Sequence, residues 1–337
     1  MIVAIIALVL LGFSVLFNLG NFISGIAAMD GGHTRGDGIK LDEVVLKDND
    51  SRNKIAVVPV EGVISSGAVD QRGHTMVDVI REQLSRAADD RRVKAVILRV
   101  DSPGGEVLAS DEIHRALTEF HEESGKTVLA VMGRVAASGG YYVSAPCQYI
   151  MAHEMTITGS IGVIISTWNY RGLMDKVGLS PYTFKSGKFK DMLSGEREKA
   201  EIPEAERALV QGWIDETYDK FKGIVRDGRA AAADKNDDDG RRLVENWEEF
   251  CDGRIFTGRE AKKLGFVDDL GNFDDAVAKV IKLAKLDDAN VIEYRMRHDF
   301  AELLGLFGKA EGRSVKVDLG LEFPKLEAGR AYFLYLP

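Results

Sequence analysis

Cysteine and proline are scarce in this chain of 337 residues, which has two cysteines and seven prolines. The thiols of Cys147 and Cys251 are too few for a disulfide framework or a cysteine-based zinc site. The low proline content excludes a collagen-like or proline-rich chain. Basic residues are also outnumbered by acidic ones: the chain has 44 Lys and Arg and 53 Asp and Glu, which gives a formal net charge of -9. We therefore expect no nucleic-acid partner.

Apolar residues, by contrast, are plentiful and make up 45% of the chain, enough for a sizeable core. At about 150 residues per domain, the length predicts two domains or one large α/β domain.

The first 29 residues contain no charged side chain and are nearly all apolar as far as Phe17. A helix of this run would reach about 40 Å, which exceeds the membrane's hydrocarbon layer of about 30 Å.

A retained membrane anchor is the interpretation we favour for this N-terminal segment, 1–29, which would contact lipid. A cleaved signal peptide would have a basic start and an Ala-x-Ala cleavage pattern, and both are missing. A buried core helix fits poorly because both of its faces would be apolar. The first Lys or Arg is Arg35, so the sequence hardly encodes an orientation.

The rest of the chain alternates between strand and helix patterns after a glycine- and charge-rich linker at 30–53. Strands are predicted at 55–60, 93–100, 127–132, 149–152 and 182–185. Helices are predicted at 76–88, 107–123, 138–144, 203–229, 257–264 and 274–286. This alternation is typical of an α/β fold with a mostly parallel, buried sheet. We place the domain at 54–288 and a C-terminal extension at 289–337, whose apolar end, 331–337, is either a packed strand or a segment for a partner.

Three of the predicted strands lead into turns rich in glycine and serine, at 101–105, 136–142 and 158–162. In parallel α/β sheets, functional sites gather at the carboxyl ends of the strands. Ser138 stands at a strand-to-helix turn, where amide donors stabilise a developing oxyanion, and Gly139 leaves its amide open. These features make Ser138 the candidate nucleophile.

A serine nucleophile needs a base, and the sequence by itself leaves two kinds open. Of the six histidines, only His153 lies close to the three turns in sequence, so a Ser-His-Asp triad is possible but has no further support. A lysine within 186–191 is the other candidate. It would act only when neutral, which requires burial, and a solvated surface charge is the simpler interpretation of a loop lysine.

Four motifs together resemble the signal peptide peptidase A (protease IV) family: DSPGG (101–105), AASGGYY (136–142), TGSIGV (158–163) and SGKFKD (186–191). Two segments, 252–259 and 261–268, are similar to the downstream signature of that family. The similarity covers about 54–278, in the short bacterial form with one catalytic domain. It implies a crotonase/ClpP-like fold, built on a repeated ββα/βαβ core, with an N-terminal transmembrane helix.

The resemblance also implies roles for single residues. Ser138 matches the nucleophile and Lys190 the general base of a Ser–Lys dyad. Ser160 matches the serine that orients the lysine, and Gly105 and Gly139 match the amide donors of the oxyanion hole. A histidine found in ClpP-type relatives would fall at Val163, and no metal or cofactor is implied.

The activity implied is that of a membrane-anchored serine endopeptidase that degrades remnant signal peptides and other short apolar peptides. The family assembles as a homo-octamer, in which Lys190 of one protomer can face Ser138 of the next. It resides in the bacterial inner membrane, with the catalytic domain outside the cytoplasm.

Three other interpretations remain beside this one. The same oxyanion geometry would serve a crotonase that acts on an acyl-CoA thioester. A membrane-anchored scaffold could bind apolar peptides without cleaving them. The acidic run at 234–245 faintly resembles a calcium loop, but its glycine falls at the seventh position and not the sixth, which favours a solvated loop.

Overall fold

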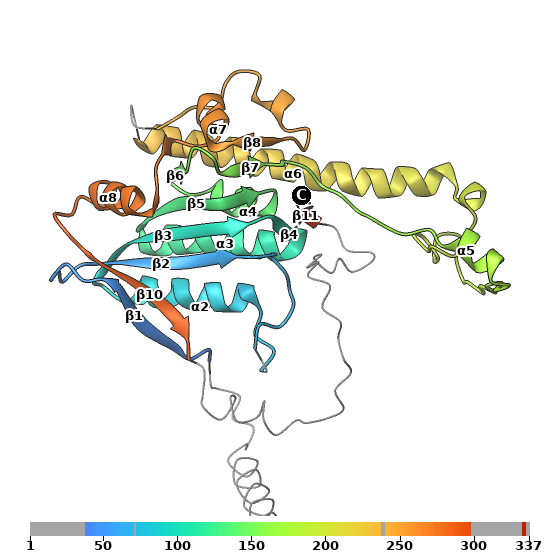
Figure 1. Cartoon of the computed structure of the whole chain (residues 1–337), viewed down its shortest axis with the longest axis horizontal. Coiled ribbons are helices and arrows are strands. Elements are labelled where there is room, and N and C mark those ends of the chain that lie inside the picture. The colour runs from blue at the N-terminus through green and yellow to red at the C-terminus, as the bar shows by residue number, and fades with distance from the viewer. Residues whose placement is uncertain (1–37, 71, 237–239, 298–331, 335–337) are drawn as a thin grey trace, which may run out of the picture. The chain divides into compact units, whose positions relative to one another are not determined.

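The computed structural model describes residues 38–70, 72–236, 240–297 and 332–334 and divides the chain into two units, 1–40 and 41–337 (Figure 1). The anchor expected at 1–29 lies outside the described residues. Within the described ranges, no helix is both long enough and apolar enough to cross a membrane.

A nine-stranded, mostly parallel sheet forms the centre of the second unit (Figure 1). Its main path runs β1-β10-β2-β3-β5-β6-β9, with β7 beside β5 and β8 beside β7. Only β1 and β8 run antiparallel to their neighbours. The predicted α/β class with a parallel-dominated sheet is therefore confirmed. The strands are β1 (Leu41–Lys47), β2 (Lys54–Glu61), β3 (Val93–Ser102), β5 (Thr127–Ala137), β6 (Tyr149–Ala152), β7 (Ile157–Gly159), β8 (Ile255–Thr257), β9 (Asp269–Leu270) and β10 (Asn290–Met296).

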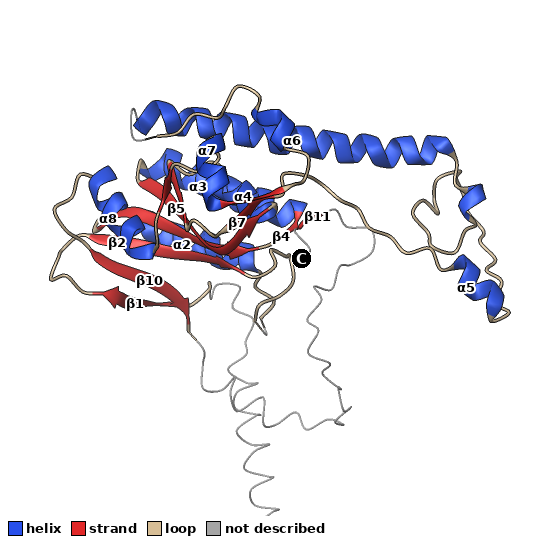
Figure 2. Cartoon of the chain, turned by 45° about the horizontal axis from the view of Figure 1, so that its top comes forward, coloured by secondary structure: helices blue, strands red, loops and turns tan. Residues whose placement is uncertain are grey.

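Helices cover both faces of this sheet (Figure 2). On one face, α8 packs its apolar side onto alternate residues of β2, β3, β5 and β6. On the other face lie α2 and α3, whose buried side chains include Ile80 and Ile113. Capping boxes begin three of the helices, at Thr75, Thr257 and Asn272. The helices are α2 (Met76–Asp89), α3 (Val107–Ser124), α4 (Gly139–Ser144), α5 (Arg171–Lys176), α6 (Glu204–Asn236), α7 (Gly258–Leu264) and α8 (Phe273–Leu283).

The sheet extends beyond the predicted domain boundaries at both ends. β1 forms inside the segment expected to be a linker, and β10 inside the expected C-terminal extension, and the two pair with each other. β10 also pairs in parallel with β2, where Val291 lies opposite Ile55. The sequence pattern missed β1 because it is an edge strand whose side chains are mostly exposed, so it carries little apolar periodicity.

An arm, defined here as residues 163–203, extends beyond the end of the sheet (Figure 2). It contains α5 and a short 3-10 helix, and it leads into the 33-residue α6. This helix returns to the body, by which we mean the sheet and the helices that cover it. The strand predicted at 182–185 is wrong, because the arm offers it no neighbouring strand to pair with. Large apolar side chains on the arm are exposed, including Trp168 (86%), Tyr182 (87%) and Phe184 (95%).

The C-terminal half of α6 is held to the body by a buried ion pair. Arg229 and Asp268 have no exposed side-chain surface, and Arg229 Nη2 lies 2.5 Å from Asp268 Oδ1. Asp268 Oδ2 also accepts the Ile150 amide at 2.8 Å, which links the pair to β6. Burial alone would lower the pKa of the Arg229 guanidinium, but the attraction of Asp268 outweighs it and raises that pKa. The guanidinium therefore stays charged, and its contact with Asp268 fixes the C-terminal half of α6.

We expect Asp268→Asn to destabilise the fold strongly, because it leaves the Arg229 guanidinium buried without a counter-charge. The expected loss is about 3 kcal/mol in the free energy of unfolding, measured by urea denaturation. Asp227→Asn is the matched control, since it removes the partner of Arg226 on the exposed side of the same helix. Equal midpoints for the two variants would contradict the role given to the buried pair.

Candidate active site

Ser138 occupies a strained turn between β5 and α4. Its backbone has φ 55° and ψ −116°, a conformation that non-glycine residues seldom adopt. The Ser138 amide donates to the Gly159 carbonyl at 2.8 Å, which holds the turn against the end of β7. The residue is 1% exposed, and no described residue hydrogen-bonds its hydroxyl. Sharp strand-to-helix turns of this kind present the nucleophilic serine in α/β-hydrolases.

The turn can approach its neighbours only because glycines follow Ser138. A Cβ on Gly139 would lie 2.7 Å from Ser110 Oγ and 3.1 Å from the Gly105 amide nitrogen. A Cβ on Gly140 would lie 2.7 Å from the Ser102 carbonyl oxygen. The start of α4 is thus pressed against the turn after β3. The amides of Gly139 and Gly105, the two predicted oxyanion donors, belong to backbones in direct contact.

Gly105 belongs to a short strand, β4 (Gly104–Glu106), that the sequence pattern missed. One edge of β4 pairs with Ile64: the Ile64 amide donates to the Gly104 carbonyl at 2.9 Å, and the Glu106 amide donates to the Ile64 carbonyl at 2.8 Å. A Cβ on Gly105 would lie 1.8 Å from the Ile64 carbonyl oxygen, so only glycine fits. Nothing in the sequence marks Ile64 as a partner, because this pairing joins segments far apart in the chain.

Successive residues of β4 present their backbone amides and carbonyls to opposite edges of the strand, and this alternation gives the direction of the Gly105 amide. Because the Gly104 carbonyl and the Glu106 amide face Ile64, the Gly105 amide and carbonyl face the opposite edge. On that edge lies β11 (Tyr332–Leu334), antiparallel to β4, with Phe333 opposite Gly105. Residues 332–334 of the apolar C-terminal segment therefore form a paired strand, and the rest of that segment lies outside the described residues.

Ser160 lies beside the Ser138 turn, after the neighbouring strand. β7 pairs in parallel with β5, and Gly159 lies opposite Ala137. Ser138 and Ser160 are therefore the next residues after two that lie side by side in the sheet. Ser160 also has a positive φ of 50°, and its amide donates to the Arg254 carbonyl at 2.7 Å. The structure therefore brings Gly105, Ser138, Gly139 and Ser160 together at one end of the sheet.

Lys190 is not brought to this end of the sheet within the chain. It lies on the arm, in an exposed turn where its amide donates to the Gly187 carbonyl at 3.2 Å. Among the described residues, no hydrogen bond or ion pair involves the Lys190 amine, and none joins it to Ser138 or Ser160. The predicted base and the predicted nucleophile are therefore on separate parts of the chain.

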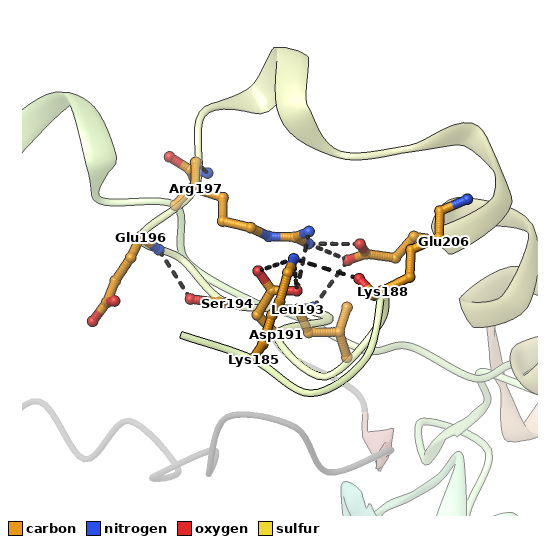
Figure 3. A network of polar contacts seen from close by, with 9 residues as sticks. Lys185, Lys188, Asp191, Leu193, Ser194, Glu196, Arg197 and Glu206 are labelled. Carbon is orange, nitrogen blue, oxygen red and sulfur yellow. Dashed lines mark hydrogen bonds and ion pairs between the residues drawn. The ribbon is translucent and has the colours of Figure 1, made fainter. Parts of the chain in front are cut away.

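The turn that carries Lys190 is shaped by a charge network on its flanks (Figure 3). Lys185 Nζ lies 2.8 Å from both carboxylate oxygens of Asp191, and its hydrogen bond lowers the pKa of that carboxyl. Arg197 Nη2 donates to both carboxylate oxygens of Glu206, at 2.5 and 2.6 Å. These contacts tie the turn to the first turn of α6, so Lys190 sits on an ordered loop with its own side chain left outside the network.

The described histidines do not supply the alternative base. His153 Nδ1 accepts the Met155 amide at 3.2 Å, within its own loop. His114 lies with its ring edge-on to Tyr142 at 5.6 Å between centroids, and burial lowers its pKa. No hydrogen bond from a described histidine reaches Ser138. A Ser-His-Asp triad therefore gains no support from this part of the chain.

Replacing Gly139 with alanine is expected to disturb the turn, because the new methyl group would collide with Ser110 and with the β4 backbone. The expected cost is about 1–3 kcal/mol in the free energy of unfolding, measured by urea denaturation. Gly212→Ala is the control, because nothing lies within 4 Å of its added Cβ on exposed α6. That change should stabilise the fold by about 0.5–1 kcal/mol, and a gain at Gly139 as well would refute the close approach.

Comparison with known proteins assigns the chain to a family. Residues 121–287 match peptidase family S49. A proposed protease of Synechocystis sp. is 40% identical over 241 residues, which cover 72% of this chain and 78% of that protein. A proposed signal peptide peptidase SppA of Enterococcus faecium is 36% identical over 260 residues, 76% of this chain and 71% of that protein. Protease 4 of Salmonella typhi is 35% identical over 246 residues, 73% of this chain and 37% of that protein. The chain therefore belongs to peptidase family S49, the family of signal peptide peptidase SppA, and is a serine-type protease.

Proposed function

We propose that this protease is an endopeptidase with a Ser–Lys dyad, in which Ser138 is the nucleophile and Lys190 the general base. The observation that carries the proposal is the strained Ser138 turn in contact with the β4 backbone. That contact brings the backbone of Gly105 close to Gly139, next to Ser138 in the chain, which supports a role for the two amides in stabilising an oxyanion. No other described serine combines a strand-to-helix turn with such neighbours.

The proposed reaction follows from these groups. The neutral amine of Lys190 removes the proton from Ser138 Oγ as the oxygen attacks the peptide carbonyl. The amides of Gly105 and Gly139 donate to the oxyanion of the tetrahedral intermediate. Lys190 then gives its proton to the leaving amine, and a water activated by the same lysine hydrolyses the acyl-enzyme. Ser160 holds the lysine in place by a hydrogen bond.

The base is supplied by a neighbouring protomer of a homo-octamer, in our proposal. This is supported by the exposed position of Lys190 on the arm, apart from the Ser138 turn of its own chain. It is also supported by the apolar side chains that the arm exposes, among them Trp168, Tyr182 and Phe184. Surfaces of this kind mark contacts with another protein. Burial of the arm in such a contact would remove water from around the Lys190 amine and favour its neutral form.

The remaining parts of the proposal concern the setting of the enzyme. We place its sheet in the crotonase/ClpP-like class, since its parallel strands end in the turns that hold the serine and the glycines. Residues 1–29 anchor the chain in the bacterial inner membrane, with the catalytic domain outside the cytoplasm. The substrates are remnant signal peptides and other short apolar peptides, which is supported by the name of the Enterococcus faecium relative.

Ser138→Ala and Lys190→Ala are each expected to lower peptide cleavage at least about 10,000-fold, since each removes half of the proposed dyad. Labelling of Ser138 by a fluorophosphonate should be lost in both variants. Lys188→Ala is the matched control, because it removes a lysine from the same turn, and it should keep both signals. Peptide cleavage that survives in Lys190→Ala would contradict the proposed Ser–Lys dyad.

Co-assembly of the two inactive variants tests whether the dyad crosses between protomers. Ser138→Ala chains keep the lysine and Lys190→Ala chains keep the serine, so random mixing in a ring would rebuild about a quarter of the sites. We expect peptidase activity to return when the variants are co-expressed, and not when either is made alone. No recovery in mixed assemblies of the correct size would place the base within the same chain.

A further inference from the structure

The helix that begins directly after Ser138 is too short to fix its own orientation. α4 has six residues, whereas an isolated helix needs about 12–15 residues to be even marginally stable in water. The Tyr142 amide donates to the Ser138 carbonyl at 2.8 Å, so the first turn of α4 and the Ser138 turn are joined. The orientation of Ser138 therefore depends on the groups that hold the side chains of α4.

The side chain of Tyr142 is held by a buried carboxylate on the neighbouring helix α3. The tyrosine hydroxyl donates to Asp111 Oδ1 at 2.7 Å, and the two residues are only 1% and 6% exposed. The ring of His114, also on α3, lies edge-on to the tyrosine ring. Burial, followed by the hydrogen bond to Asp111, raises the pKa of the Tyr142 phenol, so the hydroxyl keeps its proton and donates it to the carboxylate.

Asp111 is also tied to α6, the helix that leads back from the arm, and α4 contacts both α3 and α6 (Figure 2). Lys220 Nζ lies 2.6 Å from the same Asp111 Oδ1 atom, and Arg115 Nε lies 3.1 Å from Oδ2. The ring of Phe221, the next residue of α6, lies 4.9 Å from the Tyr142 ring between centroids. Burial alone would raise the pKa of the Asp111 carboxyl, but the hydrogen bonds from Lys220 and Tyr142 outweigh it and lower that pKa.

We propose that Asp111 is a positioning residue for Ser138, because this one carboxylate locks α4 to α6 through Tyr142 and Lys220. The role rests on the proposed function of Ser138 as nucleophile and adds a link between that serine and the helix of the arm. A displacement of about 1 Å at a reacting group can cost about 100-fold in rate, so a carboxylate that never touches the substrate still controls the rate of cleavage.

Tyr142→Phe tests the link to α4, because it removes the hydroxyl and leaves Asp111 paired with its two cations. We expect kcat to fall about tenfold, the effect of one hydrogen bond to a charged group, with KM unchanged because the ring is buried away from substrate. Tyr218→Phe is the matched control, since it removes a tyrosine hydroxyl that donates to the Cys251 carbonyl at 2.5 Å. An unchanged kcat in Tyr142→Phe, or an equal fall in Tyr218→Phe, would overturn the proposal.

Lys220→Met tests the link to α6, because it removes the ammonium group that faces Asp111 and keeps a long unbranched side chain. The Tyr142 amide should then exchange its hydrogen about threefold faster, the effect of losing one half-exposed ion pair. Lys222→Met is the matched control, since its ion pairs with Asp219 and Glu248 do not involve Asp111. Equal exchange rates in the two variants would refute the link to α6.

The exchange measurement also separates the positioning role from the proposed chemistry, because it can be made in chains that carry Lys190→Ala. If exchange differs as expected and those chains still cleave peptides, the proposed dyad fails and the role of Asp111 in holding α4 stands. If Lys190→Ala is inactive but Tyr142→Phe keeps its full kcat, the positioning role fails and the dyad stands.

Discussion

The contact between two glycine-bearing turns is the constraint on which the proposed site depends. Gly139 and Gly140 let the start of α4 press against the backbone of 102–105, and Gly105 in turn presses against Ile64. Any side chain at these positions would push the turns apart by more than the geometry of an oxyanion hole tolerates. The strained φ at Ser138 is maintained by this packing together with its hydrogen bond to Gly159.

In the proposed mechanism, the catalytic groups are divided between the body and the arm. The body holds the serine and both amides on short turns, each locked by backbone contacts. The arm carries Lys190 on a loop stabilised by Arg197, Glu206 and Asp191, and the buried pair of Arg229 and Asp268 fixes the helix that leads back to the body. If the proposed dyad forms between protomers, the protease is inactive until protomers assemble.

The α/β class, most of the element bounds and the cluster of turns at one end of the sheet were predictable from the sequence. Each of these depends on local periodicity or on the rule that parallel strands end at the same edge. The strand predicted at 182–185 shows the limit of that reasoning, because Tyr182 and Phe184 favour a strand only where a neighbour exists to pair with them. β1 shows the reverse case, in which β10 stabilises a strand that has little apolar pattern of its own.

The sequence by itself determined which residues are candidates for the chemistry, since its motifs and their resemblance to a family single out Ser138, Lys190 and the glycines. Only the tertiary structure decided which of them meet within one chain: Gly105, Ser138, Gly139 and Ser160 do, and Lys190 does not. It also decided that Ile64 and β11 occupy the two edges of β4. The physical reason is that backbone pairing between distant segments depends on register and direction in space, and residue types along the chain encode neither.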